Sequence, residues 1–444
     1  MKVSNLFAVA GIALSSAAFG QSIGADVTHQ DIQDVTSYTP VGGIRAYALG
    51  SYTCNLGNTT LQWVNNGTPA LAMNAYRLHN GRMIQIGQSW AKMACCAASG
   101  GGCGLTCNTG APGTGLKPGC RDIYSGGWNG GQSRLAPRST INGWTGVETF
   151  NGGTTGTSID KRLQIAQTDL TAANFPGSLY FVEGVYAATD DAAAGNWANN
   201  STHKRVTVDA SFNLVPVASS QQMGIPAIQA WRTHGLGVGQ LDTRVEIGTI
   251  NVPGEGRYYV ANKVTDLGNG LWQYDYAIFN LNSDRSGYAF EVPVPAGITV
   301  TNIGFNDVNY HSGEPYSNTN WASARTAGAV RWNSTQTFAQ NPNSNALRWG
   351  TMYNFWFTAN VPPRAGSGTL ELFKTGTPGS ISPTIRVPGC PSDVNLDGSV
   401  DGDDVIAFFA AWDSGSLNGG DYNGDGGVDG DDVIGFFAAW DSGC

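Results

Sequence analysis

The chain has few charged residues and no long apolar run beyond its first twenty residues. Charged side chains make up 13% of the 444 residues, about half of the usual share in a soluble domain. The longest uninterrupted apolar run after residue 20, Val405–Trp412, has eight residues, whereas a membrane-spanning helix needs about 20. We therefore expect no membrane span in the mature protein.

Lysine and arginine are missing from the C-terminal segment 390–444, which contains twelve aspartates. The formal net charge of the whole chain is -9, so the residues before this tail carry +3 together. A body so close to neutral lacks the basic stripe that binding to nucleic acid or to an anionic membrane requires. We expect neither of them as a partner.

Residues 1–20 have the pattern of a secretory signal peptide. Lys2 gives a positive start, an apolar stretch follows at 6–14, and small residues precede Gln21. A peptide of this kind is removed on export. We expect a secreted, extracellular protein that begins near Gln21 and that is attached to the cell surface or free.

Eight cysteines in an exported chain predict disulfides. Cys390 and Cys444 bracket the acidic tail, and an even number of cysteines in each group favours pairing within the group. A zinc site that includes Cys103 and Cys107 is the alternative. The early group allows fifteen pairings and consists of Cys54, Cys95, Cys96, Cys103, Cys107 and Cys120.

Short strand patterns separated by turn residues fill the body and predict a mainly β fold. Gly268-Asn269-Gly270 between two such patterns, 257–267 and 271–281, predicts a tight hairpin. We expect an antiparallel β-sandwich-like body with a Cys-rich N-terminal part and a small α-helical module at the C-terminus. The expected divisions are a signal peptide at 1–20, a Gly/Cys-rich β region at 21–151, a β-sandwich-like region at 152–374, a linker at 375–388 and the C-terminal module at 389–444.

The acidic tail is a repeat. Segments 393–415 and 421–443 align without a gap and differ at four positions. Each has Asp or Asn at loop positions 1, 3, 5, 9 and 12, and Gly398 or Gly426 at position 6. Calcium takes six to eight oxygen ligands, which such a loop supplies from alternating side chains, while glycine allows the sharp turn at position 6.

We therefore predict two calcium ions, one in each loop, with position 7 contributing a backbone carbonyl oxygen. An acidic turn in solvent, or disorder driven by carboxylate repulsion, is the alternative. The predicted ligands are Asp393, Asn395, Asp397, Ser399, Asp401 and Asp404 in the first loop, and Asp421, Asn423, Asp425, Gly427, Asp429 and Asp432 in the second.

Apolar residues recur at helical spacing behind each loop, so two short helices are expected to cover each other. A disulfide between Cys390 and Cys444 would close this module and stabilise it by roughly 4 kcal/mol on the chain-entropy model. The apolar positions are Val405, Ile406, Phe408, Phe409 and Trp412, and Val433, Ile434, Phe436, Phe437 and Trp440.

Neither loop follows an entering helix, since "RVPGCPS" and "GSLNGG" precede them, and position 12 is Asp rather than Glu. With the cysteine bracket and the terminal Gly-Cys, the tail resembles the GC-type dockerin of secreted bacterial proteins, over about 55 of the 444 residues. The resemblance implies two calcium ions and attachment to a cohesin-like or other cell-surface or scaffold receptor.

Dockerins read their partner through loop positions 10 and 11 and the helix that follows. Here those positions are Gly402-Asp403 and Gly430-Asp431, in place of the small hydroxyl residues of cellulosomal dockerins. This departure disfavours a standard cellulosomal cohesin as the partner.

The body is similar to an uncharacterised family of secreted bacterial proteins, through "GCRDIYSGGWNGGQSRLAPRS" at 119–139 and "NPNSNALRWGTMYNFWF" at 341–357. This resemblance implies no activity. The sequence favours a body that binds glycan or protein, and the alternative is a dockerin-borne, polysaccharide-directed hydrolase or esterase.

Three groups of residues bear on that choice. Gly87-Gln88-Ser89-Trp90-Ala91 imitates a nucleophile elbow, with His234 or His311 as a base. Residues Asp307, His311 and Glu314 offer an acid, a base or a metal site, although a hydrogen-bonded loop is the simpler reading. Trp272, Tyr274 and Tyr276 share one strand face and would form a sugar platform if exposed, or a core face if buried.

Overall fold

The computed structural model describes residues 21–97, 100–107, 113–153, 156–395, 400–416, 419–423 and 426–442. The expected signal peptide at 1–20 lies outside the described residues. The described chain is mainly β, as predicted, and neighbouring strands pair in antiparallel ladders. No helix within the described residues has the length and apolar character that a membrane crossing needs.

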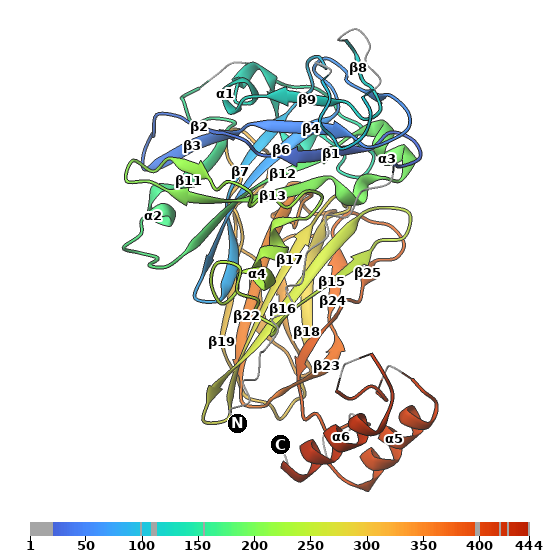
Figure 1. Ribbon diagram of the computed structural model, residues 1–444. Coiled ribbons are helices and arrows are strands. Elements are labelled where there is room, and N and C mark those ends of the chain that lie inside the picture. The colour runs from blue at the N-terminus through green and yellow to red at the C-terminus, as the bar shows by residue number, and fades with distance from the viewer. Residues whose placement is uncertain are drawn as a thin grey trace, which may run out of the picture.

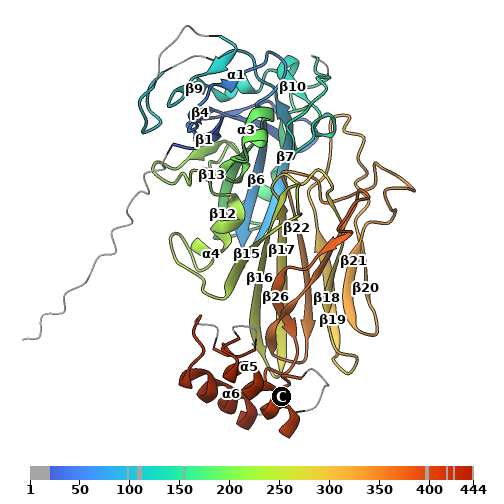
Figure 2. The same ribbon diagram turned by 90° about the vertical axis from the view of Figure 1, so that its right-hand side faces the viewer.

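Four sheets lie one upon another, with a hydrophobic cluster in each interface (Figures 1 and 2). The first sheet has three strands, and the second is a nine-stranded sheet that forms the centre of the N-terminal half. Their strands are β1 (Val27–Asp31), β4 (Ser51–Asn55) and β9 (Arg121–Tyr124), and then β14 (Leu214–Pro216), β13 (Ser201–Val208), β12 (Leu179–Ala187), β6 (Ala70–His79), β7 (Arg82–Lys92), β11 (Leu163–Ala166), β3 (Ile44–Leu49), β2 (Val35–Ser37) and β10 (Leu135–Ala136).

The third and fourth sheets form an antiparallel sandwich of five strands each. Two small two-stranded sheets complete the β structure. The sandwich strands are β15 (Val245–Asn251), β16 (Arg257–Gly268), β17 (Leu271–Asn280), β22 (Thr351–Ala359) and β19 (Val300–Asn306), against β20 (Ala322–Arg325), β21 (Ala329–Asn333), β18 (Gly287–Pro293), β24 (Thr369–Leu372) and β25 (Ser380–Ile381). The small sheets pair β23 (Pro363–Ser367) with β26 (Thr384–Pro388), and β5 (Leu61–Gln62) with β8 (Gly115–Leu116).

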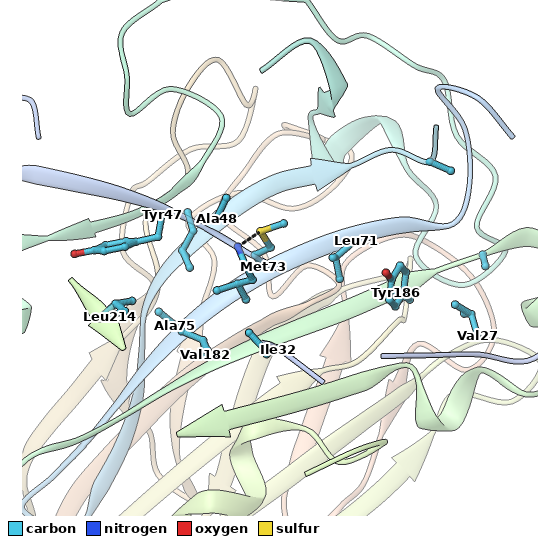
Figure 3. Packing of buried hydrophobic residues seen from close by; sticks show 14 of the residues in the cluster. Val27, Ile32, Tyr47, Ala48, Leu71, Met73, Ala75, Val182, Tyr186 and Leu214 are labelled. Carbon is cyan, nitrogen blue, oxygen red and sulfur yellow. Dashed lines mark hydrogen bonds between the residues drawn. The ribbon is translucent and has the colours of Figure 1, made fainter. Parts of the chain in front are cut away.

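Strand β6 shows why the layers stack. Its side chains alternate between two faces, so Met73 and Ala75 enter the cluster toward the three-stranded sheet, while Ala72 and Tyr76 enter the cluster toward the sandwich. In Figure 3, Ala75 lies beside Val182 of β12, its partner in the ladder. A sheet that is apolar on both faces must be covered on both, which places it between two others.

Strands on both sides of residue 151 belong to the nine-stranded sheet, since β12 pairs with β6 and β11 with β3. The division predicted at that residue therefore falls inside one sheet, and the sandwich begins at β15. The expected linker 375–388 contains β25 and β26, which pair with β24 and β23. Pairing between strands so distant in the chain leaves no mark on local composition.

The hairpin predicted around Gly268-Asn269-Gly270 is confirmed. β16 and β17 pair from Tyr258 opposite Asn280 to Gly268 opposite Leu271. Asn269 and Gly270 have φ angles of 55° and 71°, the left-handed conformations that a tight turn of this kind requires.

Two longer helices follow the sandwich at the C-terminus, and Figure 1 places them at the end of the molecule away from the nine-stranded sheet. They occupy the segments where the sequence predicts helices. Shorter helical segments lie in loops. The helices are α1 (Gly126–Asn129), α2 (Gln167–Leu170), α3 (Thr189–Ala194), α4 (Ala230–Thr233), α5 (Gly402–Asp413) and α6 (Gly430–Ser442), with 3-10 turns at Gln132–Arg134, Arg138–Thr140, Trp197–Asn199 and Ala227–Gln229.

Candidate metal centre and candidate sites in the body

The first acidic loop is closed by hydrogen bonds from its own backbone. Asp401 caps the N-terminus of α5 and accepts a hydrogen bond from the backbone N–H of Asp403 at 3.0 Å. The carboxylate of Asp404 accepts from the N–H of Asp401 at 3.0 Å with one oxygen, and from the N–H of Asn395 at 3.0 Å with the other. Position 12 thus ties together loop positions 3 and 9 and starts the helix.

The second loop repeats this arrangement. The N–H of Asp431 donates to Asp429 at 2.9 Å. The two oxygens of Asp432 accept from the N–H groups of Asp429 at 2.8 Å and Asn423 at 3.0 Å. The same residues at the same loop positions make the same bonds, so the sequence repeat is also a structural repeat.

The two position-12 carboxylates lie buried without a cationic side chain beside them. Asp404 and Asp432 are each fully buried, and neither forms an ion pair within the described residues. Hydrogen bonds from the backbone of Asn423 and Asp429 hold the pKa of Asp432 below its ordinary value and favour the charged form. A bound cation would add a compensating positive charge to these hydrogen bonds.

Nine of the twelve predicted ligands lie within the described residues, and Asp397, Ser399 and Asp425 lie outside them. Among the described residues, no three His, Cys, Asp or Glu side chains gather as a metal cluster. The donors are carboxylate, amide and carbonyl oxygens, which fit a hard cation such as Ca²⁺. The described ligands are Asp393, Asn395, Asp401 and Asp404, and Asp421, Asn423, Gly427, Asp429 and Asp432.

Helices α5 and α6 cover each other as the spacing predicts. The rings of Phe408 and Phe436 stack with centroids 4.4 Å apart, and both side chains are fully buried. Tyr422, from the second loop, meets both rings edge-on. The indole N–H of Trp412 donates to the carbonyl oxygen of Asp429 at 2.8 Å, so the first helix contacts the second loop directly.

The outer faces of these helices carry matching apolar residues. Ile406 and Ile434 occupy equivalent positions in the two repeats, and each is 68% exposed. Positions 10 and 11 of each loop are also exposed. The two repeats therefore present two similar surfaces.

Cys390, at the entrance to this module, is disulfide-bonded. Its predicted partner, Cys444, lies outside the described residues. The backbone N–H of Gly389 donates to Pro362 of the sandwich at 3.1 Å.

Four of the six early cysteines form disulfides within their group, as expected, by the pairs Cys54–Cys103 and Cys107–Cys120. The alternative zinc site at Cys103 and Cys107 is thereby excluded. Cys95 and Cys96 are free thiols with sulfur atoms 3.1 Å apart.

Ser89 does not form a nucleophile elbow. It lies inside strand β7 instead of at a turn between strand and helix, and it is buried. Its hydroxyl donates to the carbonyl oxygen of Trp90 and accepts from the N–H of Met73 at 3.1 Å. The imidazole of His311 bonds the carbonyl oxygen of Gln88, and no histidine in the described chain bonds the Ser89 hydroxyl. The residues match the motif, but the strand continues through them.

The side chains of Asp307, His311 and Glu314 bond different parts of the body. Asp307 accepts from the amide of Asn345, and Glu314 accepts from the backbone of Arg138 and Ser139. His311 bonds Ser312 at 2.6 Å and Gln88 at 2.7 Å. This is the hydrogen-bonded loop of the simpler reading. His311 lines one cavity with Asp307 and a second with Glu314.

The aromatic face of β17 is a core face, so it offers no exposed sugar platform. Tyr274 and Tyr276 are buried, and Trp272 packs against the same cluster inside the sandwich. The hydroxyl of Tyr274 donates to the carbonyl oxygen of Val361 at 3.0 Å, and that of Tyr276 donates to the carbonyl oxygen of Arg386 at 2.7 Å. The residues on the opposite face of β17, Gln273 and Asp275, line an open cavity that the sequence did not reveal.

That cavity measures about 460 Å³ and lies where the tip of the β6–β7 hairpin reaches the third sheet. Its polar lining comes from segments far apart in the chain, including Arg82, Lys263, Asp275, Asn306 and Trp356. These residues form no motif in the sequence. They come together only because the strands that carry them are neighbours in the fold.

Comparisons with known proteins assign no family. No family model matches the chain, and no curated protein matches it. Among solved structures, the exo-chitosanase CsxA of Amycolatopsis orientalis is 8% identical with a TM-score of 0.14 and covers 77% of this chain, which spans only 25% of that enzyme. The B domain of a biofilm associated protein is 12% identical with a TM-score of 0.15, over 92% of this chain and 96% of that one. TM-scores of this size do not indicate a shared fold.

Proposed function

We propose that this is a secreted protein whose C-terminal module, residues 389–444, binds two calcium ions and attaches a β-rich, glycan- or protein-binding body to a cohesin-like or other receptor at the cell surface. The observation that carries the proposal is the repeated loop geometry. In both repeats the position-12 Asp is buried and accepts hydrogen bonds from the N–H groups of positions 3 and 9. Position 12 is the place where a calcium loop of this kind has a carboxylate ligand.

Calcium would neutralise carboxylates that otherwise repel one another, so its binding would contribute to the folding of the module. At a free concentration 100 times the dissociation constant, each site adds about 2.7 kcal/mol to stability. Folded loops would then position the exposed faces around Ile406 and Ile434 for a receptor. Because both repeats present such a face, either one can serve.

The body supports a binding role better than the alternative hydrolase or esterase. Ser89 is buried within a strand and bonds no histidine in the described chain. The groups Asp307, His311 and Glu314 each have structural partners. The open polar cavity beside β17 remains as a place for a ligand.

Capture of the receptor tests the attachment. The full-length protein is immobilised and exposed to envelope extract from its own cells, in calcium and in EDTA. We expect one receptor to be retained in calcium alone. A variant with Asp404→Asn and Asp432→Asn should lose it, because the two loops lose their position-12 carboxylates.

The matched control replaces Asp413 and Asp441, equivalent exposed residues at the ends of the helices, by asparagine. This variant removes the same charge and should retain the receptor. Equal capture in calcium and EDTA, or equal loss in both variants, would contradict calcium-dependent attachment.

A further inference from the structure

The cavity beside the tip of the β6–β7 hairpin has a surplus of positive charge. Arg77, Arg82 and Lys263 line it with a single carboxylate, Asp275. Arg82 pairs with Asp275 and cancels its charge. Lys263 pairs with Asp242, which lines neither this cavity nor the one beside it, and Arg77 pairs with Asp169, which lines the neighbouring cavity. The lining of this cavity alone therefore has three cationic side chains and one carboxylate.

Several hydrogen-bond donors of this wall lack acceptors. The Nδ2 amide group of Asn306 and the Nε of Arg77 are buried atoms without a hydrogen-bond partner. Arg82 uses Nε and Nη2 on Asp275, and its Nη1 makes no hydrogen bond within the described residues. Buried donors of this kind are costly and rare in folded proteins. A ligand with acceptor oxygens would satisfy them.

The guanidinium of Arg82 is held in a fixed orientation. It lies 4.0 Å above the ring of Trp356, and Asp275 holds its edge at 2.8 Å. The indole itself lies flat on Gly304, where an added Cβ would stand only 2.0 Å from the ring. Trp356 is thus a support for the arginine, and the planar fork of the guanidinium is ready for a carboxylate.

A second cavity of about 230 Å³ continues the first along β7 and shares Ile84 and Asn306 with it. Side chains of alternate residues on one strand face the same way, so Arg82, Ile84 and Ile86 form a common floor roughly 14 Å long. The far end offers Gln164, Asp169 and Asp307, and Asp169 is already paired with Arg77, so Gln164 and Asp307 are the groups that can bond hydroxyl groups. The groove thus runs from an end lined by cationic side chains to an end whose side chains accept hydrogen bonds from hydroxyl groups.

We propose that this groove binds a carboxylate-bearing oligosaccharide, with the carboxylate on Arg82 and Asn306 and ring hydroxyls on Asp307 and Gln164. The proposal rests on the binding role assigned to the body above. A sugar chain fits because its hydroxyls both donate and accept along a polar wall, while the half-buried Ile84 and Ile86 support the apolar faces of its rings.

The test uses the full-length protein and isothermal titration with trigalacturonate, its methyl ester and neutral cellotriose. EDTA is present throughout, because calcium itself binds uronates. We expect saturable binding of trigalacturonate with one site per chain. The ester and cellotriose should bind at least about tenfold more weakly, because they lose a charge-assisted pair.

The decisive variant is Asn306→Asp, which keeps the shape of the side chain and brings a negative charge to the cationic end. It should weaken trigalacturonate binding by about tenfold or more. Asn302→Asp makes the same change on the same strand, at an exposed residue outside both cavities, and should change the affinity less than about twofold. Thermal unfolding of both variants verifies that they are folded.

Absence of binding by trigalacturonate, equal binding of the neutral sugar, or an unaffected Asn306→Asp variant would each overturn the proposal. Tighter binding of an Asp-rich hexapeptide than of the sugar would overturn it in favour of a peptide ligand. Because the titration is made without calcium, loss of the attachment function leaves its outcome unchanged, and the two proposals fail separately.

Discussion

At the scale of single residues, His311 illustrates how burial determines chemistry in this body. Its Nε2 bonds the carbonyl oxygen of Gln88 at 2.7 Å and so carries the proton. Its Nδ1 then accepts from the hydroxyl of Ser312 at 2.6 Å. Burial lowers the pKa of His311 to about 4, so the ring is neutral at ordinary pH and serves as a structural link.

We expect the imidazole resonances of His311, assigned by their absence in a His311→Gln variant, to titrate near pH 4 in an NMR experiment. The unfolded chain protonates this histidine near pH 6.5 and so binds more protons than the folded chain between pH 6.5 and 4. The stability contributed by the neutral ring is therefore lost as the pH falls through that window. A midpoint near 6.5 in the folded protein would show that the ring is open to solvent.

Cys95 and Cys96 give a second prediction at this scale. Both are free thiols, and Cys96 is exposed. A hydrogen bond from Tyr124, followed by one from Cys95, lowers the pKa of Cys96 and raises its reactivity. We expect iodoacetamide to label two cysteines per native chain without reductant, as counted by mass spectrometry. A Cys95→Ser, Cys96→Ser variant should take up none, and an unlabelled native protein would mean that these thiols are oxidised.

At the scale of elements, the pairing of α5 with α6 depends on the stacked rings of Phe408 and Phe436. Removal of a buried phenylalanine side chain costs about 3–5 kcal/mol. We expect Phe408→Ala to lower the protection of residues 402–413 by that amount in hydrogen exchange of the full-length protein with calcium. Ile406→Ala, on the exposed face of the same helix, should change it by less than about 0.5 kcal/mol. Equal effects of the two substitutions on hydrogen exchange would show that α5 does not pack against α6 through Phe408.

Elements with local signals were predictable from the sequence, and those that depend on distant pairing were not. The β16–β17 hairpin follows from an Asn-Gly turn between two strand patterns. Helices α5 and α6 follow from apolar residues at helical spacing. The ladder between β6 and β12, whose residues lie about a hundred positions apart, has no local signal, so the division expected at residue 151 fell inside a sheet.

The candidate sites divide in the same way. The predicted ligands of the acidic loops lie close together in sequence, so their spacing alone was enough to predict them. Ser89 and the aromatic residues of β17 matched motifs whose meaning depends on exposure; Ser89, Tyr274 and Tyr276 proved buried and Trp272 partly buried. The groove on β7 was missed because Arg82, Lys263 and Asn306 come from separate hairpins and strands.

At the scale of the whole molecule, the proposed functions occupy separate parts. The groove lies where the nine-stranded sheet meets the sandwich, while α5 and α6 lie beyond the sandwich at the C-terminal end (Figures 1 and 2). A receptor on the helices would therefore leave the groove open to a ligand. The near-neutral body and the strongly acidic tail agree with this separation.

Calorimetric titration of the calcium-free, full-length protein with Ca²⁺ tests the central claim most directly. We expect uptake of two ions per chain by the native protein, one by an Asp404→Asn variant and none when Asp432→Asn is added. An absence of uptake by the native protein, or uptake unchanged in the double variant, would contradict it.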